Sequence, residues 1–96
     1  MIGEIDYKVP NGKLLRIQAV FDDSEREIIK DVKITGDFFI HPEQAIFEIE
    51  NLIRGKRIRD LKKILNSYLE KNKIIIIGFE VQDILNALKE INKKQF

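Results

Sequence analysis

Cysteine is absent from the 96-residue chain, and histidine occurs once, as His41. Without cysteine the chain has no disulfide bond, thiolate metal site, thiol nucleophile or cysteine-held iron–sulfur cluster. A single imidazole excludes a metal site built from several histidines. A histidine just before Pro42 is more typical of a loop or helix cap than of a general base. Because cysteine-free chains suit a reducing compartment, we expect a cytoplasmic protein.

The chain also has no excess of charge of one sign and no long apolar run. Its 17 Lys and Arg residues are balanced by 16 Asp and Glu, which leaves a formal net charge of +1. Nucleic acids and anionic membranes are bound by clustered positive charge, so neither partner is expected. The longest apolar run, Ile74–Ile77, is far shorter than the ~20 residues of a membrane span. The first residues are not a basic segment followed by an apolar one, so no signal peptide is expected.

Motifs that usually carry catalysis or metal binding are missing as well. The five glycines are scattered and form no phosphate-binding loop, and no serine lies in a Gly-x-Ser-x-Gly context. The acidic residues between positions 22 and 27 do not have the spacing of calcium ligands, so a solvated turn is expected there. The sequence therefore predicts no catalytic residue and no metal site within this chain.

The hydrophobic pattern in the first third of the chain has a period of two residues, as in half-buried strands. Alternation over Glu4–Val9 and Lys13–Phe21 predicts two strands. Pro10-Asn11-Gly12 joins them as a turn, because proline fixes φ and Asn-Gly tolerates positive φ. A third strand, with imperfect alternation, is expected over Ile28–Thr35, and short connections of this kind are typical of an antiparallel meander. The buried face of the second strand is expected to carry Leu15, Ile17, Ala19 and Phe21.

After residue 41 the hydrophobic period changes to about 3.6 residues, which predicts helices. Pro42 suits a first helical turn, Gly55 suits a helix end, and Asn72 can close a second helix. The apolar run 73–78 is too short for a helix, so we expect it to be buried or extended. The expected fold is α+β, a single domain over residues 1–96 in which helices cover one face of a three-stranded antiparallel meander. The helices are expected over residues 42–54, 58–71 and 81–93.

The segment after the third strand combines a turn with side chains suited to recognition. Gly36 and Asp37 make the turn, and His41 precedes the expected helix. Neighbouring residues of an extended segment point to opposite faces, so one of Phe38 and Phe39 is expected in the core and the other elsewhere. Aromatic side chains are enriched at the centres of protein interfaces, which makes this loop a candidate docking surface. The same residues are also consistent with a strand exit that holds one core phenylalanine.

Two basic features allow a structural and a functional interpretation. Lys13 follows the hairpin turn, where it is either a solvated strand end or a group that reaches a phosphate or carboxylate of a partner. The stretch Arg54–Arg59, followed by Lys62 and Lys63, is expected at a helix–helix turn. It is either a solvated helix start or a site for an anion or an acidic partner protein.

A pattern that spans most of the chain is carried by the runs Tyr7–Leu14, Val32–Phe39 and His41-Pro42-Glu43. The stretch Ile77–Ile84 extends this pattern into the last expected helix. The pattern resembles the accessory domain of lipoate–protein ligases, over essentially the whole chain. It departs from the family at Asn11, where glycine is common, and at Glu80-Val81, where Ser-Pro is often found.

The resemblance implies a function carried out with a partner. In many bacterial ligases this domain is the small C-terminal domain, and in some archaea it is a separate small subunit beside a larger catalytic one. The full ligase activates lipoate with ATP to lipoyl-adenylate and then transfers the lipoyl group to a lysine of a carrier domain. The implied partner is therefore the large catalytic subunit, with lipoyl carrier domains engaged indirectly. ATP, Mg and lipoate are implied for the assembled ligase, and none is expected to be bound by this chain alone.

Two interpretations of the sequence stay open. The first is a non-catalytic small subunit of a lipoate–protein ligase, which docks on the large subunit and supports formation of lipoyl-adenylate. The alternative is a stand-alone α+β adaptor that binds acidic proteins through the basic 54–63 surface with salt-sensitive affinity. A free-standing enzyme needs a titratable cluster in a pocket, and the sequence indicates none. The residues expected to support the partner interface or the nucleotide site are Lys13, Gly36, Asp37, Phe38, Phe39 and His41.

Overall fold

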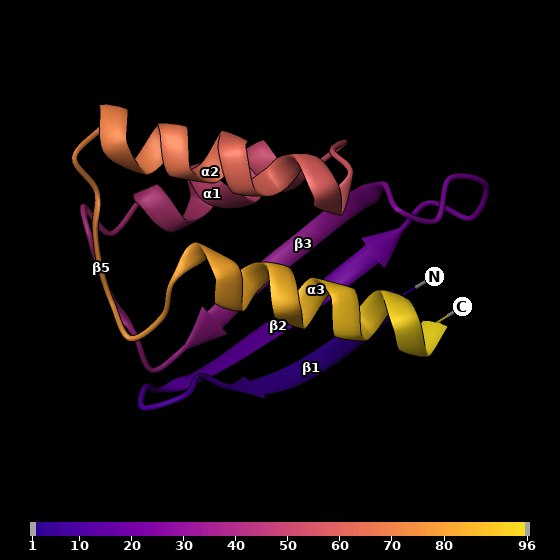
Figure 1. The fold of residues 1–96 in the computed structure, drawn as a ribbon, viewed down its shortest axis with the longest axis horizontal. Helices are drawn as coiled ribbons and strands as arrows, with labels where there is room; N and C mark the ends of the chain where they lie inside the picture. The colour runs from indigo at the N-terminus through magenta and orange to yellow at the C-terminus, as the bar shows by residue number, and fades with distance from the viewer. Residues whose placement is uncertain (1, 96) are drawn as a thin grey trace.

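The computed structural model describes residues 2–95 and contains a three-stranded antiparallel sheet (Figure 1). Its strands are β1 (Ile2–Lys8), β2 (Leu14–Phe21) and β3 (Ile29–Gly36), in the order β1-β2-β3. Each strand pairs with its neighbour in sequence, so the chain forms the expected meander. The three predicted strands are confirmed, with ends that differ by at most two residues.

The β1–β2 hairpin follows from the local sequence. Asn11 has a φ of +58°, which is the left-handed conformation that asparagine tolerates. The Gly12 N–H donates to the Val9 carbonyl at 2.9 Å, and the Val9 N–H donates to the Lys13 carbonyl at 3.1 Å. This turn sets the register of β2, whose predicted inner face is fully buried. On the outer face, Arg16 lies opposite Asp6 and pairs with it at 2.6 Å.

A β-bulge explains the imperfect alternation of the third strand. Val20 lies opposite Asp31, whereas Phe21 lies opposite Ile29, so Lys30 is the extra residue between the two pairs. An extra residue shifts the alternation by one position. Ile29 and Val32 therefore both face the core and are buried, although three positions separate them in the sequence.

Three helices lie on one side of this sheet, as expected (Figure 1). They are α1 (Ala45–Ile53), α2 (Ile58–Lys71) and α3 (Val81–Gln95). α3 packs on β1 and β2, α1 packs on β3, and α2 packs against α3 and α1. Their apolar stripes form the core with the inner face of the sheet. Within residues 2–95 no helix is both long and apolar enough to cross a membrane.

The start of the first helix differs from the prediction. The sequence places Pro42 in the first helical turn, but α1 begins at Ala45. The Ala45 N–H donates to the Pro42 carbonyl at 3.0 Å, and the Ile46 N–H donates to the Glu43 carbonyl at 3.4 Å. These i to i+3 bonds are the tighter pattern that commonly precedes an α-helix. His41 is also not a helix cap, because it lies in a strand, and its peptide bond with Pro42 is cis.

A second, two-stranded sheet pairs β4 (Phe39–His41) with β5 (Ile75–Ile77). The apolar run 73–78 is therefore extended, which confirms one of the two expectations for it. It is not buried throughout, because Ile75 and Ile77 are exposed. The pairing with β4 was not predicted, since it joins segments that lie on opposite sides of α1 and α2 in the sequence.

Candidate functional site

Three loops meet near Gly78 and bring together the two segments that the sequence marks as candidates. The Lys13 N–H donates to the Gly78 carbonyl at 3.4 Å, and the Asp37 N–H donates to the Leu14 carbonyl at 3.2 Å. A Cβ placed on Gly78 lies 3.1 Å from the Cβ of Phe38 and 3.5 Å from the Cγ of Lys13. Lys13 and the turn after β3 are therefore neighbours in the fold. We call Lys13, Gly36, Asp37 and Gly78 the turn cluster.

Gly36 is required by the geometry of this cluster. Its φ is +148°, which residues with a side chain rarely adopt. A Cβ at this position lies 2.3 Å from the Leu14 carbonyl oxygen, so a side chain collides with backbone. The glycine thus lets β3 end close to β2 and turn toward Phe38.

The two adjacent phenylalanines face opposite ways, as predicted. The ring of Phe38 packs edge-on against Phe79, with centroids 4.9 Å apart and an interplanar angle of 83°. Phe39 begins β4 and is 55% exposed. One aromatic side chain therefore packs against the core, and the other is exposed.

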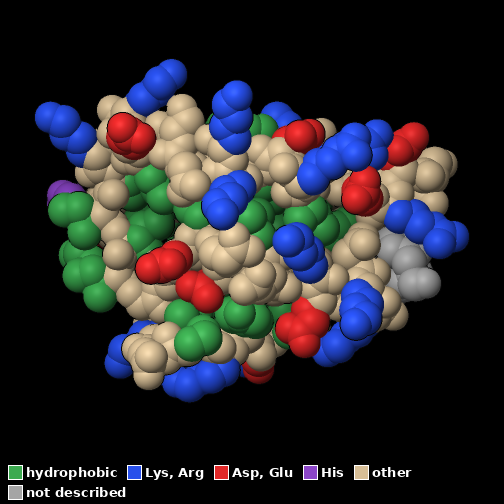
Figure 2. All heavy atoms as spheres, viewed as in Figure 1, with side chains coloured by type: hydrophobic (Ala, Val, Ile, Leu, Met, Phe, Trp, Pro, Cys, Tyr) green, Lys and Arg blue, Asp and Glu red, His purple; other side chains and the backbone are tan. Residues whose placement is uncertain are grey.

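Phe39 belongs to a group of apolar side chains on the outer face of the β4–β5 ribbon. It lies opposite Ile77, and His41 lies opposite Ile75. Opposite residues of an antiparallel pair share a face, and all four of these residues are exposed. Figure 2 shows the single histidine beside hydrophobic side chains, at the end of the molecule where Figure 1 shows β5. We call Phe39, His41, Ile75 and Ile77 the ribbon face.

Sequence reasoning found Phe39 and His41 but missed Ile75 and Ile77 as surface residues. A run of four isoleucines is usually interpreted as buried on both faces. The shortness of the run is the signal that could have indicated exposure, because a short strand at the edge of a small domain is easily left with one face uncovered. Once the segment is extended, its alternate side chains must point to opposite faces.

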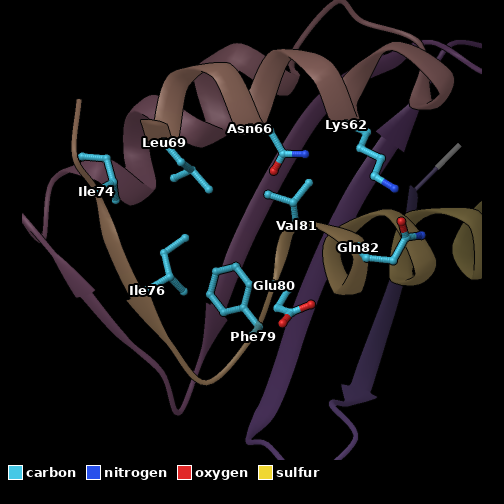
Figure 3. Close-up of a pocket in the computed structure, with 9 residues that line it drawn as sticks. All are labelled: Lys62, Asn66, Leu69, Ile74, Ile76, Phe79, Glu80, Val81 and Gln82. Carbon is cyan, nitrogen blue, oxygen red and sulfur yellow. The ribbon is translucent and has the colours of Figure 1, made fainter. Parts of the chain in front are cut away.

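A shallow groove of about 520 Å³ lies between β5, α2 and the start of α3 (Figure 3). Ile74 and Ile76 point into it from the side of the ribbon opposite to the ribbon face, and Phe79 lies at its floor. Lys62 and Glu80, which carry opposite charges, both line it. Its apolar lining continues into the core.

The basic stretch 54–63 is partly neutralised within the fold. The Arg54 Nε lies 2.6 Å from an Asp31 carboxylate oxygen, and this contact holds the pKa of Asp31 below its usual range. Arg57 lies 3.0 Å from Glu25 and 3.8 Å from Glu27. These two arginines thus fasten the ends of α1 and α2 to the sheet and to the loop before β3. The exposed remainder of the stretch is Arg59, Lys62 and Lys63.

The acidic segment 22–27 forms a closed turn. The Asp22 carboxylate accepts the backbone N–H groups of Glu25 and Ser24, each at 2.8 Å. These two bonds lower the pKa of Asp22. No group of three or more His, Asp or Glu side chains within residues 2–95 is arranged to hold a metal ion.

Comparison with known proteins agrees with the pattern in the sequence. The family described as bacterial lipoate protein ligase C-terminus matches residues 16–88. The chain is 33% identical over 86 residues to lipoate-protein ligase A subunit 2 of Thermoplasma acidophilum, which covers 90% of this chain and 86% of that protein.

A solved structure is also similar to this fold. It describes an archaeal lipoylation system from Thermoplasma acidophilum, with a bi-partite lipoate protein ligase and its E2 lipoyl domain. The TM-score is 0.76 at 31% sequence identity, with 92% of this chain and 94% of that chain covered. The chain therefore belongs to the lipoate protein ligase C-terminus family.

Proposed function

We propose that this chain is the non-catalytic small subunit of a two-part lipoate–protein ligase. It docks on a large catalytic subunit and supports the ATP-dependent activation of lipoate to lipoyl-adenylate. The observation that carries this proposal is the similarity, over nearly all of both chains, to a protein named as subunit 2 of such a ligase.

The turn cluster suggests how the small subunit acts on adenylation. Lys13 is exposed, and its contact with Gly78 places it next to the Gly36–Asp37 turn. Docked over the nucleotide site of the large subunit, this cluster excludes water and adds positive charge or backbone donors near the phosphates. Such groups stabilise the charge that develops during phosphate chemistry, and they act more strongly where water is excluded.

The assembled ligase, rather than this chain, provides the remaining components in this proposal. ATP, Mg²⁺ and lipoate are held by the large subunit. The lipoyl group is then transferred to a lysine of a carrier domain, which the small subunit serves indirectly. The presence of an E2 lipoyl domain in the similar archaeal system supports carrier domains of this kind as the acceptors.

The proposal is tested by measuring lipoyl-adenylate formation by the large subunit from the same source, with and without this chain. We expect a strong dependence on the chain. Lys13→Ala and Phe39→Ala are expected to slow this step or weaken binding to the large subunit. Lys89→Ala, at an exposed position of α3, is the matched lysine control and is expected to behave as wild type. Equal activity without the chain contradicts the proposal, and wild-type behaviour of both test variants contradicts a role of Lys13 and Phe39 in docking or adenylation.

A further inference from the structure

The ribbon face is a compact block of side chains fixed by strand pairing. Phe39 lies opposite Ile77, and His41 lies opposite Ile75. The Cβ atoms of such opposite residues are about 5 Å apart, and diagonal neighbours are still within reach of aromatic side chains. Phe39, Ile75 and Ile77 therefore form one continuous apolar surface with His41 at its edge.

This surface is unusual because the positions that face solvent are the apolar ones. Phe39, Ile75 and Ile77 are 55%, 54% and 62% exposed, while Ile40 on the inner face of the ribbon is 6% exposed. The outer face of the three-stranded sheet is different, because its β1–β2 positions carry polar pairs such as Asp6 with Arg16. On that outer face the exposed apolar residues Ile2 and Leu14 lie only at strand ends, whereas three of the four ribbon-face positions are apolar.

The size of the surface indicates what can cover it. Each of the three apolar side chains leaves on the order of 100 Å² uncovered, so together they expose roughly 300 Å². A stable interface buries about 800 Å² on each partner. The ribbon face alone is therefore too small for a stable dimer of this chain, and it is the right size for the apolar centre of a wider interface.

The surroundings of the ribbon face supply that wider area and a charge pattern. Phe39 continues through Phe38 into the turn cluster, and Ile77 precedes Gly78 of the same cluster. Lys73 and Lys13 lie beyond the two ends of β5, and Asp37 and Glu43 lie beyond the ends of β4. Because the two strands are antiparallel, Lys13 and Asp37 lie at one end of the ribbon, and Lys73 and Glu43 lie at the other. Each end therefore carries both signs of charge, and a partner that covers the ribbon face must present a complementary group to each.

We propose that the ribbon face is the surface through which this chain docks on the large catalytic subunit, with Ile75 and Ile77 at the centre of the contact. The proposal rests on the proposed function, and it assigns the contact to the β4–β5 ribbon instead of to the turn cluster alone. The surface that it fits on the large subunit is apolar, with both signs of charge at its rim. Docking there places the turn cluster at the border of the interface.

The test is the affinity of the purified chain for the large subunit, measured by calorimetry. The double variant Ile75→Thr and Ile77→Thr keeps the β-branched side chains that suit a strand but removes apolar surface. Ile2→Thr is the matched control, because Ile2 is a 74% exposed isoleucine in β1, near the N-terminal end and far from the ribbon in Figure 1. We expect the double variant to bind at least roughly tenfold more weakly and Ile2→Thr to bind as wild type.

Each other result has a distinct meaning. If the wild-type chain binds and the double variant binds equally well, the ribbon face is not the interface, while the proposed function stands. If the wild-type chain does not bind at all, both the proposed function and this inference fail. A homodimer in sedimentation analysis that the double variant abolishes also overturns the inference, because the surface then serves self-association. Circular dichroism checks that each variant is folded. If the double variant is unfolded, the single variant Ile77→Thr takes its place in the binding test.

Discussion

Glu50 shows how one buried carboxylate closes the edge of a sheet. β3 is an edge strand, and its Ile34 N–H donates to a Glu50 carboxylate oxygen at 2.8 Å. Glu50 lies on α1, which packs against this strand, and it is 7% exposed. The helix therefore satisfies a backbone donor that otherwise has no strand to pair with, which also protects the edge from pairing with other chains.

Removal of the Glu50 carboxylate is expected to destabilise the fold. Glu50→Ala leaves the Ile34 N–H buried without an acceptor, which costs about 1–3 kcal/mol. Glu50→Gln keeps an acceptor oxygen and is expected to cost clearly less. Urea unfolding of the two variants measures the difference. If both variants lose the same stability, the negative charge rather than the hydrogen-bond acceptor is what matters.

Tyr68 makes the stability of the fold depend on pH in the alkaline range. Burial, together with a hydrogen bond to Glu48, raises its pKa from 10.0 to about 12. Between these values the unfolded chain loses the phenolic proton while the folded chain keeps it. The contribution of Tyr68 to stability is therefore complete below pH 10 and is lost as the pH rises toward about 12.

We expect the free energy of unfolding to fall over this range in the wild type and to fall less in Tyr68→Phe. Unfolding experiments on both proteins, at a pH below 10 and at one between 10 and 12, measure this difference. An absorbance titration of Tyr7→Phe, which leaves Tyr68 as the remaining tyrosine, reports its pKa directly. A midpoint near the ordinary value of 10 contradicts the burial argument.

The end of β3 has a backbone conformation that only glycine can adopt easily. Gly36 combines a φ of +148° with a position where a Cβ meets the Leu14 carbonyl oxygen at 2.3 Å. Gly55, after α1, also has a positive φ, of +80°, but nothing lies within 4 Å of its Cβ position. A side chain at Gly55 therefore introduces backbone strain alone, whereas a side chain at Gly36 also collides with the backbone of β2.

Alanine at these two positions tests that difference. Gly55→Ala is expected to cost on the order of 1 kcal/mol, which is the usual penalty of a left-handed backbone for a residue with a side chain. Gly36→Ala is expected to cost more, because the strand must also move away from β2. Thermal unfolding of both variants gives the comparison. Equal losses of stability contradict the expected collision with Leu14.

At the scale of the whole molecule, the basic stretch 54–63 is partly paired within the chain, whereas the ribbon face is exposed. Of the basic stretch 54–63, Arg54 and Arg57 are paired with acidic residues of the same chain. The ribbon face has no such covering within residues 2–95, because its side chains remain exposed. This contrast favours partner binding through the ribbon face over the alternative in which a basic surface binds acidic proteins.

Neutralising the exposed part of the basic stretch distinguishes the two alternatives. The triple variant Arg59→Ala, Lys62→Ala and Lys63→Ala is expected to bind the large subunit as tightly as the wild type. Support of lipoyl-adenylate formation is also expected to be unchanged, because these side chains are not part of the ribbon face. Affinity at low and high ionic strength checks this expectation, since exposed charge pairs are screened by salt. A large loss of binding at low salt favours the adaptor alternative.

Local sequence determined the three strands of the meander, the three helices and the faces that they bury. The periods of two and about 3.6 residues are properties of neighbouring positions, so they can be read without the fold. The split between Phe38 and Phe39 has the same origin, because alternation along an extended segment is local. Asn11 and Gly55 likewise adopt the positive φ values that their residue types predict.

Only the tertiary structure decided which distant segments became neighbours. β4 pairs with β5 across α1 and α2, and Gly78 joins the Lys13 turn to the end of β3. The pairing of Arg54 and Arg57 with acidic residues follows from the docking of helix ends on the sheet. Such contacts depend on how whole elements pack. A local periodicity contains no information on which remote strand covers one face of Ile74–Ile77 and leaves the other face open.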